Sequence, residues 1–136
     1  MSSMTQVVRT NDRTLRTVLA VCSIAAGLIH AAVVREHLEE DWVFGAFFIV
    51  VAALQIVWAI PISLDVSVIP FASAGILGSG ALVALWAVSR TAGLPIGPGA
   101  WMPEPVQTLD VSATVLELVL VAGALVLVRR RRLGSV

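Results

Sequence analysis

The sequence predicts an all-α integral membrane protein in which a single domain forms a four-helix transmembrane bundle. The first observation is composition: 58% of the 136 residues are hydrophobic and only 13% are charged, against roughly 45–50% and about 25% in soluble domains. A chain of this length cannot cover so much apolar surface with polar groups, which excludes a water-soluble globule. The second observation is that four apolar stretches are each long enough to cross a bilayer core of roughly 30 Å, which takes about 20 helical residues.

The predicted spans are residues 15–34, 44–64, 69–88 and 111–128. The first connection, 35–41, is short and acidic, and the second is a tight turn around Asp65 between Pro61 and Pro70. The third, 89–110, is the only long connection and contains four of the six prolines, which keep a backbone out of helix. We therefore expect 89–110 to be an ordered, Pro/Gly-rich extracytoplasmic loop or a partly re-entrant cap.

Arginines at the two ends of the chain set the predicted orientation. Arg9, Arg13 and Arg16 precede the first span, and a run of four, 129–132, directly follows the last. The positive-inside rule places such residues in the cytoplasm, so both termini are predicted to be cytoplasmic in a multi-pass protein of the bacterial inner (cytoplasmic) membrane. Because the run abuts a span, we interpret it as a topology anchor beside anionic lipid, and we expect no nucleic-acid partner.

Small residues gather in the third span, where Gly75 and Ser79 lie four residues apart. Such pairs let helix backbones approach closely in lipid. The pattern predicts close packing within the bundle or between copies, with a homo-oligomer or another membrane protein as partner. It also supports an alternative function, that of a structural or assembly subunit of a larger membrane complex.

Ionisable side chains in the spans are the candidate functional residues, because burying them in a bilayer is costly. His30 and His37 are seven residues apart, nearly two helical turns, and so are Asp110 and Glu117. The first span runs outward and the last inward, so His37 and Asp110 are expected together at the outer interface. His30 and Glu117 are then each roughly 10 Å deeper. The predicted site is a polar track with two levels in the outer half of the bundle.

Four further polar residues complete the predicted site. Glu36, Arg90 and Glu104 are expected near the mouth of the track. Gln55 lies deeper in the second span and is expected to close the inner end.

The His/carboxylate set leaves four interpretations open. It suits a transition metal ion such as Zn, Cu or Fe, held by residues of one level because levels roughly 10 Å apart are too distant for a single ion. It also suits a haem with His30 as axial ligand; either group would serve sensing, delivery or redox chemistry. Histidine and carboxylate also form proton relays, which predicts a proton-coupled small-solute carrier. Across two membrane helices they are, finally, ordinary hydrogen-bonding partners.

Motifs typical of catalysis are absent from the sequence. The chain has no Gly-rich phosphate loop, no Gly-x-Ser-x-Gly, no His-Glu-x-x-His and no Cys-x-x-Cys. We therefore assign no catalytic residue and do not expect an enzyme.

Two segments that carry these polar residues resemble a group of proteins. One has the pattern His-Ala-Ala…Glu-His over residues 30–37, and the other has Ser-Arg-Thr-x-Gly-Leu-Pro-x-Gly-Pro over 89–98. Over about residues 26–117 the chain resembles small four-span bacterial membrane proteins, common in actinobacteria, that have no established function. The resemblance implies the four-span fold and the same polar residues, and it implies no reaction. Gln107 stands where the pattern has glycine, which is expected to alter the geometry of the loop.

Overall fold

The structure is a computed structural model that describes residues 3–134, with side chains from residue 11 onward. Within this range the chain forms four helices: α1 (Ser3–Glu40), α2 (Trp42–Ser63), α3 (Val68–Thr91) and α4 (Thr108–Leu133). Each is long and apolar enough to cross a membrane, in α1 over Asn11–Glu40. The predicted all-helical class, with four helices able to span a membrane, is confirmed. The side chain of Arg9, one of the predicted anchors, lies outside the described residues.

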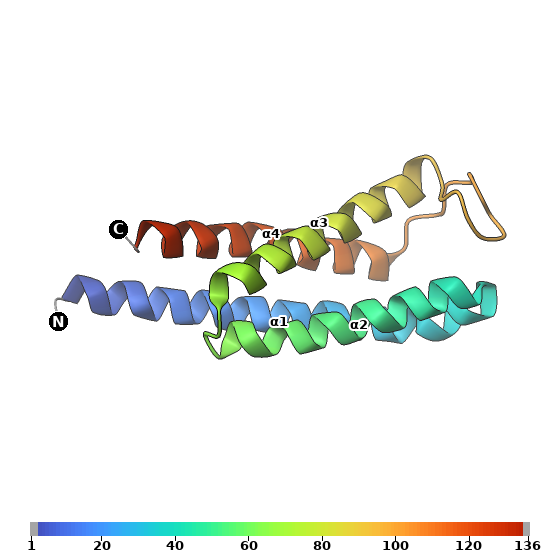
Figure 1. Ribbon diagram of the computed structural model, residues 1–136. Coiled ribbons are helices and arrows are strands. Elements are labelled where there is room, and N and C mark those ends of the chain that lie inside the picture. The colour runs from blue at the N-terminus through green and yellow to red at the C-terminus, as the bar shows by residue number, and fades with distance from the viewer. Residues whose placement is uncertain (1–2, 135–136) are drawn as a thin grey trace.

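The four helices form an elongated bundle in which successive helices run in opposite directions (Figure 1). One end, which we call the termini end, holds the start of α1, the end of α4 and the turn 64–67. The other, the loop end, holds the α1–α2 turn and the segment 92–107. Helix α1 packs closely on α2 and α4, whereas α3 packs on α4 and diverges from α2 toward the loop end. Helices α2 and α3 are therefore the least closely packed neighbours.

Helix α1 continues through most of the acidic segment 35–41, which the sequence predicts as a connection. Only Asp41 separates α1 from α2. Glutamate and arginine are good helix formers, and this segment is rich in them. His30 and His37 consequently lie on one uninterrupted helix.

The apolar core lies in the termini half of the bundle. Its buried residues come from all four helices: Leu19, Ile62, Val68, Ala72, Leu120, Ala124, Leu127 and Val128. Small residues bring the backbones close together, since a Cβ built on Gly27 of α1 would lie 3.1 Å from the carbonyl oxygen of Ala52 in α2. In lipid, such packing holds helices together without a hydrophobic driving force between them.

Gly75, one of the predicted small-residue pair, contacts Trp58 of the same chain. A Cβ on Gly75 would lie 2.5 Å from Trp58 Cζ2, and the indole is held because its Nε1 donates to the carbonyl oxygen of Phe71 at 2.7 Å. We expect Gly75→Ala to lower the free energy of unfolding by about 1–3 kcal/mol, the usual cost of overpacking. Denaturation followed by circular dichroism in detergent measures this.

Gly80→Ala is the matched control on the same helix. Apart from Gly80 itself, its chain neighbours and the nearby backbone of its own helix, no described atom lies within 4 Å of the position of a Cβ on Gly80. Alanine favours a helix over glycine by about 1 kcal/mol. We therefore expect Gly80→Ala to leave stability unchanged or to raise it. Equal losses in the two variants would contradict the packing role of Gly75.

Ion pairs connect three segments at the termini end. Asp12 of α1 lies 3.5 and 3.2 Å from Arg130 and Arg131 of α4. Asp65, in the turn after α2, lies 2.6 Å from Arg131 and 3.5 Å from Arg16 of α1. We call these five residues the arginine clasp. Both acids of this end are thus neutralised by arginines from other segments.

Candidate functional site

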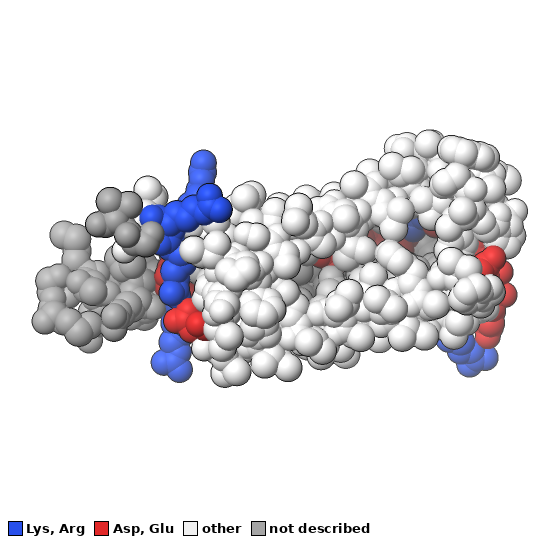
Figure 2. All heavy atoms as spheres, viewed as in Figure 1, with Lys and Arg blue, Asp and Glu red and all other residues white. Residues whose placement is uncertain are grey.

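A cavity of about 380 Å³ lies in the loop half of the bundle, between the four helices and the loop segment. Its wall is mostly apolar and includes four aromatic side chains: Phe44, Phe47, Phe48 and Trp86. On the face shown in Figure 2, charged atoms gather at the two ends of the molecule, and between the ends they are visible only inside a groove. The cavity has the size of a small-molecule pocket, for which the usual range is roughly 300–1,000 Å³.

Three side chains from three helices meet at the deep end of this cavity. We call His30, Gln55 and Glu117 the buried triad. Glu117 is only 2% exposed, and its Oε1 lies 3.5 Å from His30 Nε2 and accepts a hydrogen bond from Gln55 Nε2. Glu117 Oε2 and Gln55 Oε1 are buried and have no hydrogen-bond partner among the described residues. Because unpartnered buried acceptors are rare in folded proteins, this carboxylate has capacity for a ligand, a water molecule or a proton.

Small residues of α1 bring Gln55 into the triad. Ser23 Oγ donates to the backbone carbonyl oxygen of Gln55 at 2.8 Å. One turn later, Gly27 lets α2 approach, since a Cβ there would lie 3.4 Å from Gln55 Cβ. His30 follows almost one turn further along α1 and completes the same face. The close α1–α2 contact therefore positions His30 and Gln55 beside Glu117.

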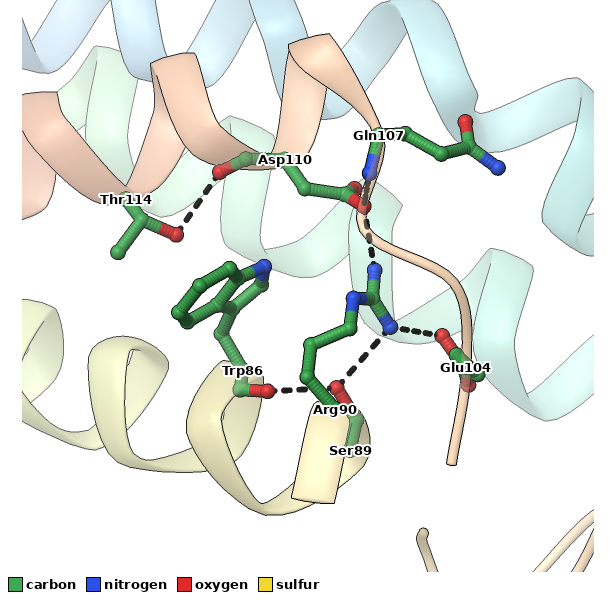
Figure 3. A network of polar contacts seen from close by, with 7 residues as sticks. All are labelled: Trp86, Ser89, Arg90, Glu104, Gln107, Asp110 and Thr114. Atoms are coloured by element: carbon green, nitrogen blue, oxygen red, sulfur yellow. Dashed lines mark hydrogen bonds and ion pairs between the residues drawn. The ribbon is translucent and has the colours of Figure 1, made fainter. Parts of the chain in front are cut away.

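A second polar cluster, around Arg90, lies at the other end of the cavity (Figure 3). Arg90, near the end of α3, pairs with Glu104 of the loop segment and with Asp110 of α4. Asp110 also accepts a hydrogen bond from the backbone amide of Gln107 at 3.1 Å, as part of the capping box that begins α4. Hydrogen bonds between guanidinium and carboxylate are among the strongest in proteins. This cluster therefore holds α3, the loop segment and α4 together.

Six of the eight predicted site residues line the cavity: His30, His37, Arg90, Glu104, Asp110 and Glu117. Gln55 joins them through its hydrogen bond to Glu117. Glu36 does not, because it is exposed on α1. The residues expected deeper in the bundle, His30 and Glu117, contact each other directly.

The expected contact between His37 and Asp110 is not found among the hydrogen bonds of residues 11–134. His37 Nδ1 donates to the carbonyl oxygen of Val33 at 2.9 Å, and the imidazole ring packs on Phe48 with centroids 4.2 Å apart. Asp110 pairs with Arg90 instead. The physical reason is charge, because a permanently charged guanidinium binds a carboxylate more strongly than a neutral imidazole does.

A metal ion or a haem finds no support in this geometry. Over the part of the chain whose side chains are described, no three His, Cys, Asp or Glu side chains gather closely enough to hold an ion. His30 and Glu117 supply two donors, and the third neighbour, Gln55, presents an amide N–H to the carboxylate. His30 Nε2 also faces Glu117, so this nitrogen is not free to bind a haem iron. Metal and haem binding stay predictions from the sequence alone.

A second cavity, of about 390 Å³, lies between α2 and α3, closer to the termini end. Gln55 and Ser23 line it, together with Trp58 and Gly75, and Leu82 lines both cavities. Glu117 lines the first cavity and Gln55 the second. The hydrogen bond between these two side chains therefore connects a residue of the first cavity with a residue of the second.

The sequence reasoning missed two parts of the site. Arg90 was expected near the mouth of the track, but Asp110 was expected to pair with His37, although an arginine beside acidic residues was a usable signal for the Arg90–Asp110 pair. The sequence reasoning also assigned no role to the aromatic wall. Phe44, Phe47 and Phe48 are spaced by three and four residues, so they share a helix face, and this spacing could have indicated a common lining.

No family model, no curated protein and no solved structure matches this chain. The fold and site nevertheless define a class. The chain is a multi-pass α-helical membrane protein with a buried carboxylate in the wall of a cavity.

Proposed function

We propose that this protein is a proton-coupled carrier of a small amphiphilic solute. The solute binds in the loop-half cavity and exchanges with a proton at the buried triad. One observation carries the proposal: Glu117, 2% exposed, lines the loop-half cavity and keeps Oε2 without a partner among the described residues. A carboxylate in a purely structural role would be expected to use both oxygens.

The proposed orientation has both termini in the cytoplasm and the loop end outside, in the bacterial inner membrane. The arginine clasp and the remaining C-terminal arginines support it, because cationic residues next to a span favour the cytoplasmic side. Trp42 and Trp101, at the loop end, are 73% and 68% exposed, as expected of indoles at a membrane interface. In this orientation the triad and the first cavity lie in the outer half of the bundle.

The proton step follows from the cost of a bare charge in the membrane. An ionised Glu117 far from water is costly unless a proton or another cationic group neutralises it. His30 is the titratable group in contact with it, Gln55 is neutral, and Asp110 and Arg90 are paired at the other end of the cavity. A solute that binds the Glu117 carboxylate takes the place of the proton that would otherwise neutralise it. Solute and proton therefore compete for one site, and this competition couples them.

Gln55 suits both protonation states of Glu117. In the present arrangement its amide nitrogen donates to the carboxylate. Rotation of the amide by half a turn exchanges nitrogen and oxygen, after which Oε1 can accept a hydrogen bond from the protonated acid. The triad can thus keep or release a proton without losing the contact between α2 and α4.

The proposal is tested in proteoliposomes that contain a pH-sensitive dye. Three probes of matched ring size are added outside: benzyltrimethylammonium, benzyl alcohol and benzenesulfonate. We expect at least one probe to drive proton movement in the wild-type protein, with the rate reduced about tenfold or more in Glu117→Gln. Glu40→Gln, an exposed acid of α1 that does not line either cavity, is the matched control and should behave as wild type.

Two results would overturn the carrier proposal. One is proton movement no faster than in protein-free vesicles with all three probes. The other is a purified protein that binds about one Zn²⁺, Cu²⁺ or Fe²⁺ per chain and loses it in His30→Ala, which would favour the metal site predicted from the sequence.

A further inference from the structure

We infer that the solute is a lipophilic organic cation, a quaternary ammonium or protonated amine that carries an apolar or aromatic group. This inference rests on the proposed function and specifies its substrate class. It joins three observations on the loop-half cavity: the balance of charges around it, the position of the unpartnered oxygen of Glu117 and the chemistry of the wall.

The charged groups that line the cavity are predominantly acidic. They are Glu104, Asp110 and Glu117 against the single guanidinium of Arg90. Arg90 is already bonded to both Glu104 and Asp110, so it offers little attraction to an anion. Clefts lined by one sign of charge concentrate ligands of the opposite sign, and this balance favours cations.

The position of Glu117 determines where the cationic group would bind. Asp110 and Glu117 are seven residues apart on α4, so roughly 10 Å separates the Arg90 cluster from the buried triad. At the deep end, the neighbours that contact Glu117 are an imidazole and an amide. Glu117 Oε2 has no partner among the described side chains. A cationic group at the deep end would therefore meet a carboxylate oxygen that is free to receive it.

The wall excludes a hydrated inorganic ion and favours an organic one. Between the two polar clusters the cavity is apolar, with Phe47, Phe48 and Trp86 among its lining residues. A hydrated ion would lose its water along this wall without gaining oxygen ligands. An organic cation keeps its apolar group in contact with the wall and gains attraction from the aromatic faces. Phe48 is placed for this, because its ring centroid lies 5.5 Å from that of His30 in the triad.

The exchange is balanced in charge. One cation enters the deep end, and one proton leaves the His30–Glu117 pair for the water of the loop-half cavity. The net charge of the site is unchanged, so neither state leaves a bare carboxylate in the membrane. At the other end, Trp86 Nε1 and Arg90 Nε are buried donors without a partner among the described residues. They would bind an acceptor group on a longer solute.

The test compares two molecules of the same shape that differ in charge. Binding of radiolabelled benzyltrimethylammonium to the purified full-length protein is measured by equilibrium dialysis in detergent, with released protons followed by an indicator dye. Neopentylbenzene, in which carbon replaces the cationic nitrogen, serves as the neutral competitor. We expect saturable binding with release of about one proton per bound cation and no displacement by neopentylbenzene. Glu117→Gln should weaken binding about tenfold or more.

Further variants separate loss of the ligand site from loss of the fold. Glu117→Asp keeps the carboxylate and should retain the binding that Glu117→Gln loses. Phe48→Leu removes an aromatic face and should weaken binding roughly threefold. Glu40→Gln should bind as wild type. Binding that is unchanged in Glu117→Gln, or that is lost equally in Glu117→Asp and Glu117→Gln when both remain folded, overturns the inference.

The inference and the proposed function fail in different ways. If benzyl alcohol or benzenesulfonate, and not the ammonium probe, drives Glu117-dependent proton movement in vesicles, the substrate class is wrong and the carrier proposal remains. If none of the probes moves protons, the carrier proposal fails. Binding of the cation to Glu117 without any release of protons would also overturn the exchange.

Discussion

Replacement of Arg90 by glutamine is expected to lower the free energy of unfolding by about 2–3 kcal/mol, because a partly buried guanidinium loses its charged hydrogen bonds to Glu104 and Asp110. The Arg90 side chain is 12% exposed and that of Asp110 is 22% exposed. Without the guanidinium, Asp110 and Glu104 repel each other at the junction of α3, the loop segment and α4. Denaturation in detergent, followed by the loss of helical circular dichroism, measures the effect.

Arg35→Gln is the matched control for this prediction. Arg35 also pairs with a carboxylate, that of Glu39 at 3.0 Å, but its side chain is 90% exposed. Exposed pairs of this kind contribute about 0.3–0.5 kcal/mol, so the loss should be small. A loss in Arg90→Gln no larger than in Arg35→Gln would show that the Arg90 cluster is solvated and does not hold the loop end together.

The second large effect is expected at the opposite end of the bundle, where Arg16→Met should destabilise the protein by about 2–3 kcal/mol. Arg16 is 8% exposed, and its Nη1 donates to the carbonyl oxygens of Ile62 and Ser63 at 3.2 and 3.1 Å. These carbonyls belong to the last turn of α2, where the regular hydrogen bonds of the helix end. Methionine preserves most of the side-chain volume, so the loss reports the polar contacts of Arg16. These are the two hydrogen bonds, which are strong when the donor is charged, and the 3.5 Å ion pair with Asp65.

Arg13→Met, on the same helix, controls for loss of positive charge. Arg13 is exposed, and we expect its replacement to change stability by less than about 0.5 kcal/mol. Thermal unfolding of the two variants side by side measures the difference. Equal destabilisation of Arg13→Met and Arg16→Met would show that stability depends on the number of charges near the termini and not on the contact between Arg16 and α2.

The positions of the helices were predictable from the sequence. Composition and span length reflect the lipid surroundings of a membrane helix and do not depend on tertiary contacts. The four predicted spans all fall within, or within one residue of, the observed helices. The extension of α1 through residues 35–40 was not predicted. An acidic segment between two spans suggests a solvated turn, but its residues are also good helix formers, and a single residue, Asp41, is enough to reverse the chain.

The sequence predicted how deep the residues of the candidate site lie in the bundle, but not which residues they contact. The rise of a helix gives depth, and the contact between His30 and Glu117 follows from it. The rotation of each helix about its axis and the competition between donors do not follow from spacing. Asp110 therefore pairs with Arg90, while His37 bonds to its own helix. Gln55, expected deeper, joins the level of Glu117 because α1 and α2 cross closely at Gly27.

The arginine clasp also has a consequence for the order in which the protein assembles. Asp12 and Arg131 are separated by nearly the whole described chain, yet they are in contact. Contacts of such long sequence separation form late, because the intervening chain must first be arranged. During synthesis from the N-terminus, α1, α2 and α3 are made before the arginines that neutralise Asp12. We therefore expect closure of the termini end to follow insertion of α4, and in the proposed orientation a chain that has not reached that step is open toward the cytoplasm.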